Sequence, residues 1–121
     1  MTDKKTAGNF GEDIASEYIK NRGMKIIKRN FYCRSGEIDI IATDGEYTVF
    51  IEVKTRKNAK YGTPGEFVDY YKQQKIIKAA QYYAQGSSEL YMRFDVCEVY
   101  YHTDGDELIS DKVNYIENAF C

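Results

Sequence analysis

Apolar residues recur at helical spacing in two separate parts of the chain. The first set lies three and four residues apart, and it consists of Phe10, Ile14, Ala15, Tyr18 and Ile19. This spacing predicts a helix over about residues 8–22, which Gly23 closes in the manner of a helix C-terminus. The same period returns between Phe67 and Gln85, so we expect a second helix there, ending before the Gly-Ser-Ser at residues 86–88.

Short apolar and β-branched runs outside these helices predict four strands. They cover about residues 24–33, 36–44, 45–56 and 93–101. The Thr-Asp-Gly-Glu at residues 43–46 favours a hairpin, because Asp-Gly accepts the positive φ of a tight turn. Residues 57–66 hold two glycines and the single proline, so we expect a loop there. The acidic segment from Asp104 onward receives no element.

The order of these elements, α, β, β, β, α, β, favours an α/β or α+β fold with helices packed on a sheet. The three successive strands suggest an antiparallel meander. No repeat or linker interrupts the 121 residues, so we expect one domain over residues 1–121 that buries roughly two thirds of its unfolded surface.

Charge is unevenly distributed along the chain, whose net charge is −2. Residues 1–85 carry 15 Lys and Arg against 11 Asp and Glu, whereas residues 86–121 carry 2 against 8. This asymmetry permits a basic face for phosphate contacts on an acidic protein, although a solvated mixed surface explains it equally well.

Neither a signal peptide nor a membrane span is expected. The first ten residues lack the apolar core of a signal peptide, and no segment approaches the roughly 20 apolar residues that cross a bilayer. The three cysteines, Cys33, Cys97 and Cys121, are widely spaced and fit reduced thiols better than disulfides or a zinc site. These features predict a cytoplasmic protein.

Three charged side chains lie inside apolar segments that are otherwise expected to be buried. They are Asp39, Glu52 and Lys54. In a strand, residues two apart share a face, so Glu52 and Lys54 point together and Val53 points away. If the Asp-Gly turn makes the two flanking strands neighbours, Asp39 converges on this pair. Carboxylate oxygens from Asp39 and Glu52, with the Val53 backbone carbonyl and water, would suit Mg²⁺ or Mn²⁺. The Lys54 ammonium could then stabilise charge on a phosphate.

A plainer interpretation of these residues stays open on spacing alone. Glu52 and Lys54 could form an ordinary ion pair on a solvated face of the sheet.

The sequence resembles the PD-(D/E)xK nuclease signature. Asp39 lies in "GEIDIIATDG", and Glu52-Val53-Lys54 lies in "FIEVKTR" after the hairpin. More narrowly, the chain resembles the YraN family of bacterial proteins over nearly its whole length. Further matching segments are "GNFGEDIA", "YGTP", "YYKQQKIIKAA", "RFDV" and "NAF".

This resemblance implies a restriction endonuclease-like αβββαβ core with a mixed sheet flanked by helices. It implies kinship with archaeal Holliday junction resolvases, and therefore favours a Mg²⁺-dependent endonuclease acting on DNA, with branched or structured DNA as a candidate substrate, while the choice between DNA and RNA stays open. Metal ligands would fall on Asp39 and Glu52, and the site lysine on Lys54. Glu12 matches an additional acidic residue, although a carboxylate favoured by the helix macrodipole explains it equally well. The role of Glu37, beside Asp39, stays open.

Basic residues after the third strand are candidates for nucleic-acid contacts: Arg56, Lys57, Lys60 and, on the second helix, Lys72. Lys75 and Lys78 follow Lys72 at three-residue intervals. Tyrosines such as Tyr70-Tyr71 and Tyr82-Tyr83 could stack on bases, but in each pair we expect one ring to pack inward. His102 is expected to be structural.

Two other functions remain alternatives to a nuclease. The first is a nucleic-acid-binding module that keeps the nuclease fold but does not cut. The second is a protein-interaction role through the acidic segment Asp104 to Asp111. Resolvase relatives are dimers, so the resemblance also allows a homodimer.

Overall fold

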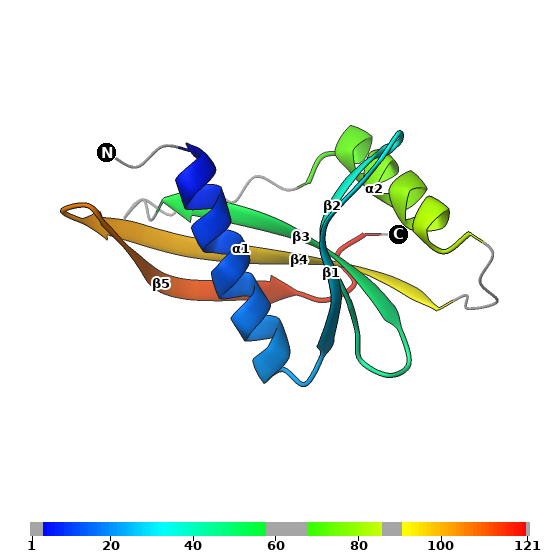
Figure 1. Cartoon of the computed structure of the whole chain (residues 1–121), viewed down its shortest axis with the longest axis horizontal. Coiled ribbons are helices and arrows are strands. Elements are labelled where there is room, and N and C mark those ends of the chain that lie inside the picture. The colour runs from blue at the N-terminus through cyan, green and yellow to red at the C-terminus, as the bar shows by residue number, and fades with distance from the viewer. Residues whose placement is uncertain (1–3, 58–67, 86–90, 121) are drawn as a thin grey trace.

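The computed structural model describes residues 4–57, 68–85 and 91–120, with two helices and five strands in this part of the chain. Figure 1 shows a sheet crossed by one helix on each side. The elements follow one another as α1 (Lys4–Asn21), β1 (Lys25–Cys33), β2 (Gly36–Thr43), β3 (Thr48–Lys57), α2 (Tyr70–Tyr83), β4 (Met92–Asp104) and β5 (Glu107–Ile116).

The five strands form one mixed sheet in the order β1-β2-β3-β4-β5. The predicted antiparallel meander of β1, β2 and β3 is confirmed, and Gly45 has the positive φ, 98°, that the hairpin turn requires. Strand β4 pairs with β3 in parallel, and α2 lies in the connection between them. The α+β class and the αβββαβ order are therefore confirmed.

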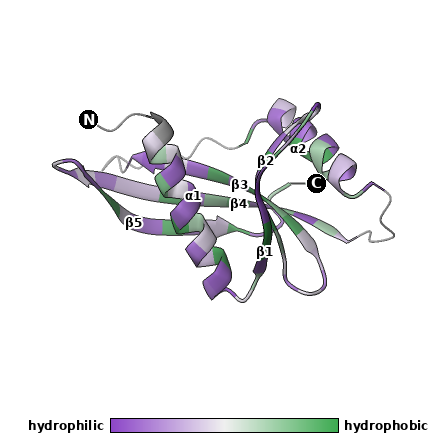
Figure 2. Ribbon diagram, in the orientation of Figure 1, coloured by the Kyte–Doolittle hydropathy of each residue, from purple (hydrophilic) through white to green (hydrophobic). Residues whose placement is uncertain are grey.

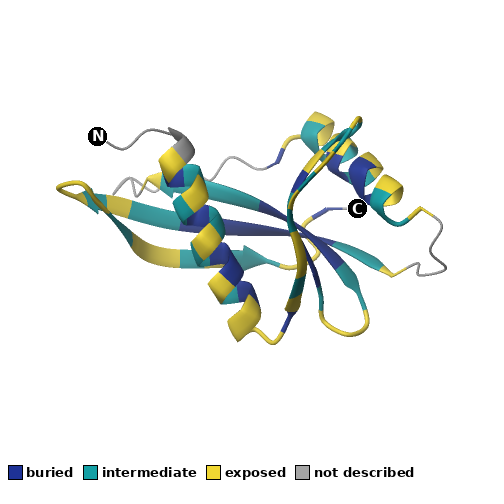
Figure 3. Ribbon diagram, in the orientation of Figure 1, coloured by how far each residue is buried: buried dark blue, intermediate teal, exposed yellow. Residues whose placement is uncertain are grey.

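Each helix covers one face of the sheet and closes one apolar cluster. Beneath α1, Ala15 and Ile19 pack with Ile40, Ile51 and neighbouring residues. Beneath α2, the cluster includes Ile76, Ala80, Phe50 and Phe94. Figure 2 shows green and purple segments alternating along both helices, as expected when a helix buries one side. Figure 3 shows that the middle of β3 and β4 is buried between the two layers.

The pairing between β2 and β3 ends early, which opens a fork in the sheet. Only residues 40–43 of β2 pair with residues 48–51 of β3. Strand β2 nevertheless continues to Gly36, paired with β1, and β3 continues to Lys57, paired with β4. In Figure 1 the β1–β2 hairpin accordingly turns steeply away from β3–β5. Asp39 and Glu52 are the first residues beyond the last β2–β3 pair.

Several boundaries differ from the sequence prediction. Helix α1 begins at Lys4 rather than near residue 8, and α2 begins at Tyr70 because the Asp69 side chain caps it by accepting a hydrogen bond from the Lys72 backbone N–H at 2.8 Å. The expected loop at residues 57–66 lies outside the described residues, except that Lys57 ends β3.

The acidic segment from Asp104 onward forms the turn and the last strand of a β4–β5 hairpin. Gly105 has a φ of 64°, which the turn requires, and β5 pairs antiparallel with β4. Most of β5 is exposed or half-buried, and the tip of the hairpin is exposed in Figure 3. An exposed strand lacks the continuous apolar run that identifies a buried one, so the sequence did not reveal it.

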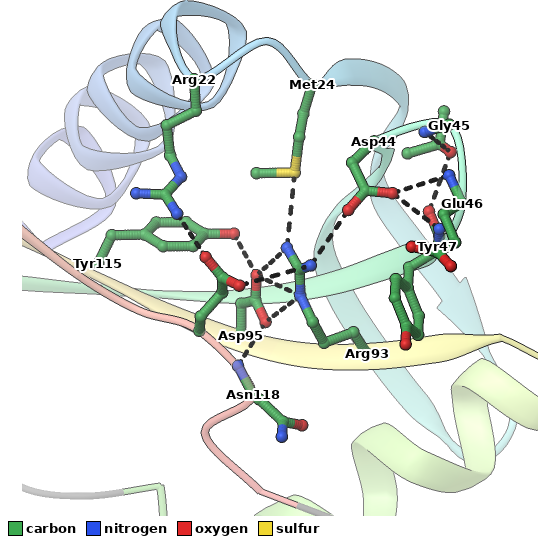
Figure 4. Close-up of polar contacts among 12 residues, drawn as sticks. Arg22, Met24, Asp44, Gly45, Glu46, Tyr47, Arg93, Asp95, Tyr115 and Asn118 are labelled. Carbon is green, nitrogen blue, oxygen red and sulfur yellow. Dashed lines mark hydrogen bonds and ion pairs between the residues drawn. The ribbon is translucent and has the colours of Figure 1, made fainter.

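An ionic cluster centred on a buried carboxylate lies where β4, β5 and the β2–β3 turn come together (Figure 4). The Asp95 side chain is fully buried, and it accepts hydrogen bonds from Arg93, the Tyr115 hydroxyl at 2.6 Å and the Asn118 backbone N–H at 2.8 Å. Arg93 also pairs with Asp44 in the β2–β3 turn at 3.1 Å. The cluster therefore ties together β4, β5 and the β2–β3 turn.

Candidate active site

Asp39 fills the point where β2 separates from β3. Its carboxylate oxygen Oδ2 accepts a hydrogen bond from the Val53 backbone N–H at 2.8 Å. Within the described residues, a side chain thus takes the place of the next backbone pairing between the two strands. The carboxylate of Asp39 is held in the plane of the sheet, beside residues of β3.

An irregularity in β2 brings the Asp39 side chain to this position. Regular alternation would put Ile38 and Ile40 on the same face of the sheet. Instead, Ile38 belongs to the cluster beneath α2 and Ile40 to the cluster beneath α1. On the neighbouring strand, Asn30 has a φ of 54°, an uncommon value outside glycine. The local distortion lies between these residues, and Asp39 is at its centre.

Glu52 is buried, and it directly precedes Val53, whose backbone N–H binds the Asp39 carboxylate. Burial raises the pKa of Glu52 to about 7, and the negative charge of Asp39 adds to this effect. Nearby Lys72 and Lys54 act in the opposite direction. With its pKa raised to about 7, Glu52 carries a proton for part of the time near neutral pH.

Two lysines reach the same oxygen of Glu52. Lys54, two residues along β3, places its Nζ 3.8 Å from Glu52 Oε2, so the predicted common face of Glu52 and Lys54 is confirmed. Lys72, from the first turn of α2, places its Nζ 3.5 Å from that oxygen. The lysine that we expected to contact nucleic acid from the helix surface thus lies against the central carboxylate.

Glu12 approaches Asp39 from α1, on the other side of the fork. Burial raises the pKa of Glu12, and the nearby charge of Asp39 raises it further, whereas Arg29 lowers it. Arg29 lies 3.6 Å from Glu12 and 3.0 Å from Asp13, so it holds the middle of α1 against β1. The sequence pattern gave no sign of this role for Arg29, because it depends on how α1 lies across the sheet.

Gly11 sets how closely α1 approaches the sheet beside Glu12. A Cβ atom at residue 11 would lie 2.0 Å from the Thr55 Oγ1 atom of β3, far inside any allowed contact. The absence of a side chain therefore lets the helix backbone rest on β3. This contact carries Glu12 to the edge of the fork.

The remaining candidates lie farther from the two carboxylates. Glu37 is exposed and does not join Asp39 and Glu52. Arg56 pairs with the buried Glu98 of β4 at 3.3 Å, and Lys57 is exposed at the end of β3. Lys60 lies outside the described residues. Sequence reasoning missed Glu98, although a glutamate inside the apolar strand at residues 93–101 was a signal for it.

Side chains at the fork supply only part of the oxygen ligands that a hard divalent cation would need. Carboxylate oxygens suit Mg²⁺ and Mn²⁺, and a cation between Asp39 and Glu52 would offset the repulsion between their negative charges. Within residues 6–57, 68–85 and 91–120, no three His, Cys, Asp or Glu side chains gather into a metal-binding group. A site at Asp39 and Glu52 would thus rest on two carboxylates, with main-chain oxygen and water completing it, as Mg²⁺ commonly requires.

The fold and the fork define an α+β protein with a five-stranded mixed sheet, two flanking helices and an acidic pair beside a lysine at the strand divergence. The family model described as Uncharacterised protein family UPF0102 matches residues 11–99, which include every one of these side chains. The chain belongs to this family, which is the YraN family.

Curated relatives match the chain almost end to end. A UPF0102 protein of Caldanaerobacter subterraneus subsp. tengcongensis is 48% identical over 119 residues, which cover 97% of this chain and 96% of the relative. A UPF0102 protein of Clostridium botulinum strain Loch Maree is 49% identical over 119 residues, with 96% and 94% covered. None of the helices in the described part of the chain combines the length and apolar character that crossing a membrane requires.

Proposed function

We propose that this chain is a cytoplasmic, Mg²⁺-dependent endonuclease that hydrolyses phosphodiester bonds of DNA, with branched or otherwise structured DNA as its substrate class. The observation that carries the proposal is the meeting of the Asp39 and Glu52 carboxyl groups with the Lys54 ammonium at the fork between β2 and β3. Keeping two carboxyl groups and a lysine half-buried together costs stability, which a bound cation and a phosphate would offset.

In this proposal, Asp39, Glu52 and the Val53 carbonyl hold Mg²⁺ or Mn²⁺. A bound ion would polarise a phosphoryl oxygen and lower the pKa of a water molecule at the site. Lys54 lies on the same face as Glu52, where its ammonium orients water and stabilises negative charge on the phosphate. Glu12 contributes negative charge near Asp39 from the α1 side, and Arg29 contacts it at 3.6 Å.

Basic residues around the fork provide the DNA contacts. Lys72 is positioned by the cap of α2 and lies beside the site, so it can reach the phosphate next to the scissile one. Arg56 and Lys57 continue along β3 from Lys54. Lys60 follows them in the chain and completes the proposed set.

The direct test is cleavage of end-labelled four-way junctions, flaps, single strands and duplexes in Mg²⁺ or Mn²⁺. We expect Glu52→Gln and Asp39→Asn each to reduce cleavage by about 100-fold or more. Glu37→Gln is the matched control, because Glu37 is an exposed carboxylate two residues from Asp39 and outside the site. Undiminished cleavage by Glu52→Gln would overturn the assignment.

A binding module without activity would give a different result in the same experiment. It would bind DNA with salt dependence but without regard to divalent metal, and none of the substrates would be cut.

A homodimer also belongs to the proposal, since β1 and β5 are the edges of the sheet and one copy would act on each DNA strand. Light scattering on the purified protein should then give twice the mass of one chain.

A further inference from the structure

We propose that the exposed flank of α2 binds a single-stranded segment of DNA, with Tyr71 and Tyr82 stacking on unpaired bases and Lys75 and Lys78 contacting the phosphates between them. This inference rests on the proposed function, since it supplies the surface along which an unpaired strand leads to the fork. The four residues, at positions 71, 75, 78 and 82, recur at helical spacing and share one side of the helix.

The charge of α2 is complementary to a phosphate backbone. Its 14 residues include three lysines, Lys72, Lys75 and Lys78, and no Asp or Glu. Lys75 and Lys78 are both exposed, whereas Lys72 turns toward Glu52. By contrast, α1 has a mixed composition with three acidic residues. The unbalanced positive charge is therefore a property of the helix that adjoins the site.

The tyrosines of α2 expose more ring surface than the sequence led us to expect. The Tyr82-Tyr83 pair follows the prediction, because Tyr83 packs edge-on against Phe50 at 6.0 Å while Tyr82 is 59% exposed. For Tyr70-Tyr71 the prediction that one ring packs inward is wrong: they are 73% and 72% exposed. Both belong to the first turn of α2, away from its buried residues.

The arrangement of Tyr71 and Lys75 suits contact with a nucleotide. The Lys75 ammonium lies 4.7 Å from the centroid of the Tyr71 ring, so a cation and an aromatic face are already combined. At the other side of Lys75, its Cβ and backbone carbonyl adjoin Gly36 of the β1–β2 hairpin. The β1–β2 hairpin thus packs against α2 at Lys75, within the stripe that consists of Tyr71, Lys75, Lys78 and Tyr82.

Unpaired bases are the occupant that these side chains favour. Stacking on an aromatic ring requires an open base face, which single-stranded DNA offers and an intact duplex hides. Aromatic rings alternating with cations are typical of surfaces that bind single strands without sequence preference. From Tyr71 to Tyr82 the stripe extends about 16 Å, enough for a few nucleotides.

The test is binding of a fluorescent oligo(dT) to the full chain carrying Glu52→Gln, measured with EDTA so that chemistry plays no part. We expect Tyr71→Ala and Tyr82→Ala each to weaken binding between about 5- and 100-fold, and Tyr71→Phe to bind as the parent does. Lys75→Gln with Lys78→Gln should lower the slope of log affinity against log salt by about 1.4.

Two controls make the result specific to base stacking. Tyr70→Ala removes a ring of equal exposure that lies about 100° away around the helix, and it should leave binding unchanged. An abasic oligonucleotide should bind the Tyr71→Ala variant and its parent equally. Equal losses for Tyr70→Ala and Tyr71→Ala, or an undiminished Tyr71→Ala effect on the abasic strand, would overturn the proposal. Because no cleavage is measured, these outcomes are separate from the fate of the nuclease assignment.

Discussion

Replacing Gly11 with alanine should push α1 away from the sheet. The new Cβ would lie 2.0 Å from Thr55 Oγ1 and 3.0 Å from Thr55 Cβ, whereas ordinary contacts begin near 3.4 Å. The helix must therefore move outward by about 1.4 Å, or Thr55 must change its rotamer within β3. Forcing a methyl group into a packed interface typically costs about 1–3 kcal/mol. The better helix propensity of alanine offsets up to about 1 kcal/mol of this cost.

We expect a net loss of about 1–2 kcal/mol for Gly11→Ala in urea or thermal unfolding. For a domain of this size that corresponds to a lower Tm by roughly 3–12 °C. Gly8→Ala is the matched control in the same helix, because a Cβ at residue 8 meets nothing within 4 Å. It should stabilise the protein by about 0.5–1 kcal/mol, since only the propensity term remains.

A second substitution identifies the clash as the cause. Thr55→Ala removes the Oγ1 and Cγ2 atoms, so Gly11→Ala should cost less in the Thr55→Ala background than in the parent, by about 1 kcal/mol. The reasoning fails if Gly11→Ala is as stable as Gly8→Ala, or if the cost is the same in both backgrounds. Because Glu12 follows Gly11, cleavage by the Gly11→Ala variant should fall even where the protein remains folded.

Three further outcomes follow from buried groups. Burial and Asp39 raise the pKa of Glu52 from 4.5 to about 7, so the folded state keeps a proton that the unfolded chain loses, and the free energy of unfolding should fall as pH rises between these values. Urea titrations across that range should show a flatter dependence for Glu52→Gln. Asp95→Asn should cost about 3–5 kcal/mol, because it removes the buried negative charge that pairs with Arg93, whereas Asp44→Asn at the exposed side should cost less than about 1 kcal/mol. Burial raises the pKa of Cys97 to about 12, so mass spectrometry after brief alkylation should find Cys33 modified well before Cys97.

The acidic pair and its lysine could be selected from sequence because strand geometry is local. Alternation along β3 places Glu52 and Lys54 together wherever the strand lies, and the Asp-Gly turn brings Asp39 onto the neighbouring strand. The resemblance to a known motif then added a chemical meaning. These inferences require only the period of a strand and the geometry of a tight turn, both of which a short segment encodes.

The fork itself was decided by tertiary structure. No pattern of residues indicated that β2 leaves β3 at Asp39, or that Ile38 and Ile40 face opposite layers. Such a distortion arises because the β1–β2 hairpin follows α2 while β3 stays with β4, and each strand has an apolar face to bury.

Contacts between distant segments likewise appear only in the folded chain. Lys72 of α2 contacts Glu52 of β3, which lies 20 residues earlier in the chain, and Arg29 of β1 contacts Glu12 of α1. The exposed strand β5 escaped prediction because its stability comes from pairing with β4 rather than from its own composition. Local pattern thus determined the helices, the meander and the identity of the reactive side chains, whereas packing of the two layers determined which charges meet, since long-range contacts depend on the whole arrangement.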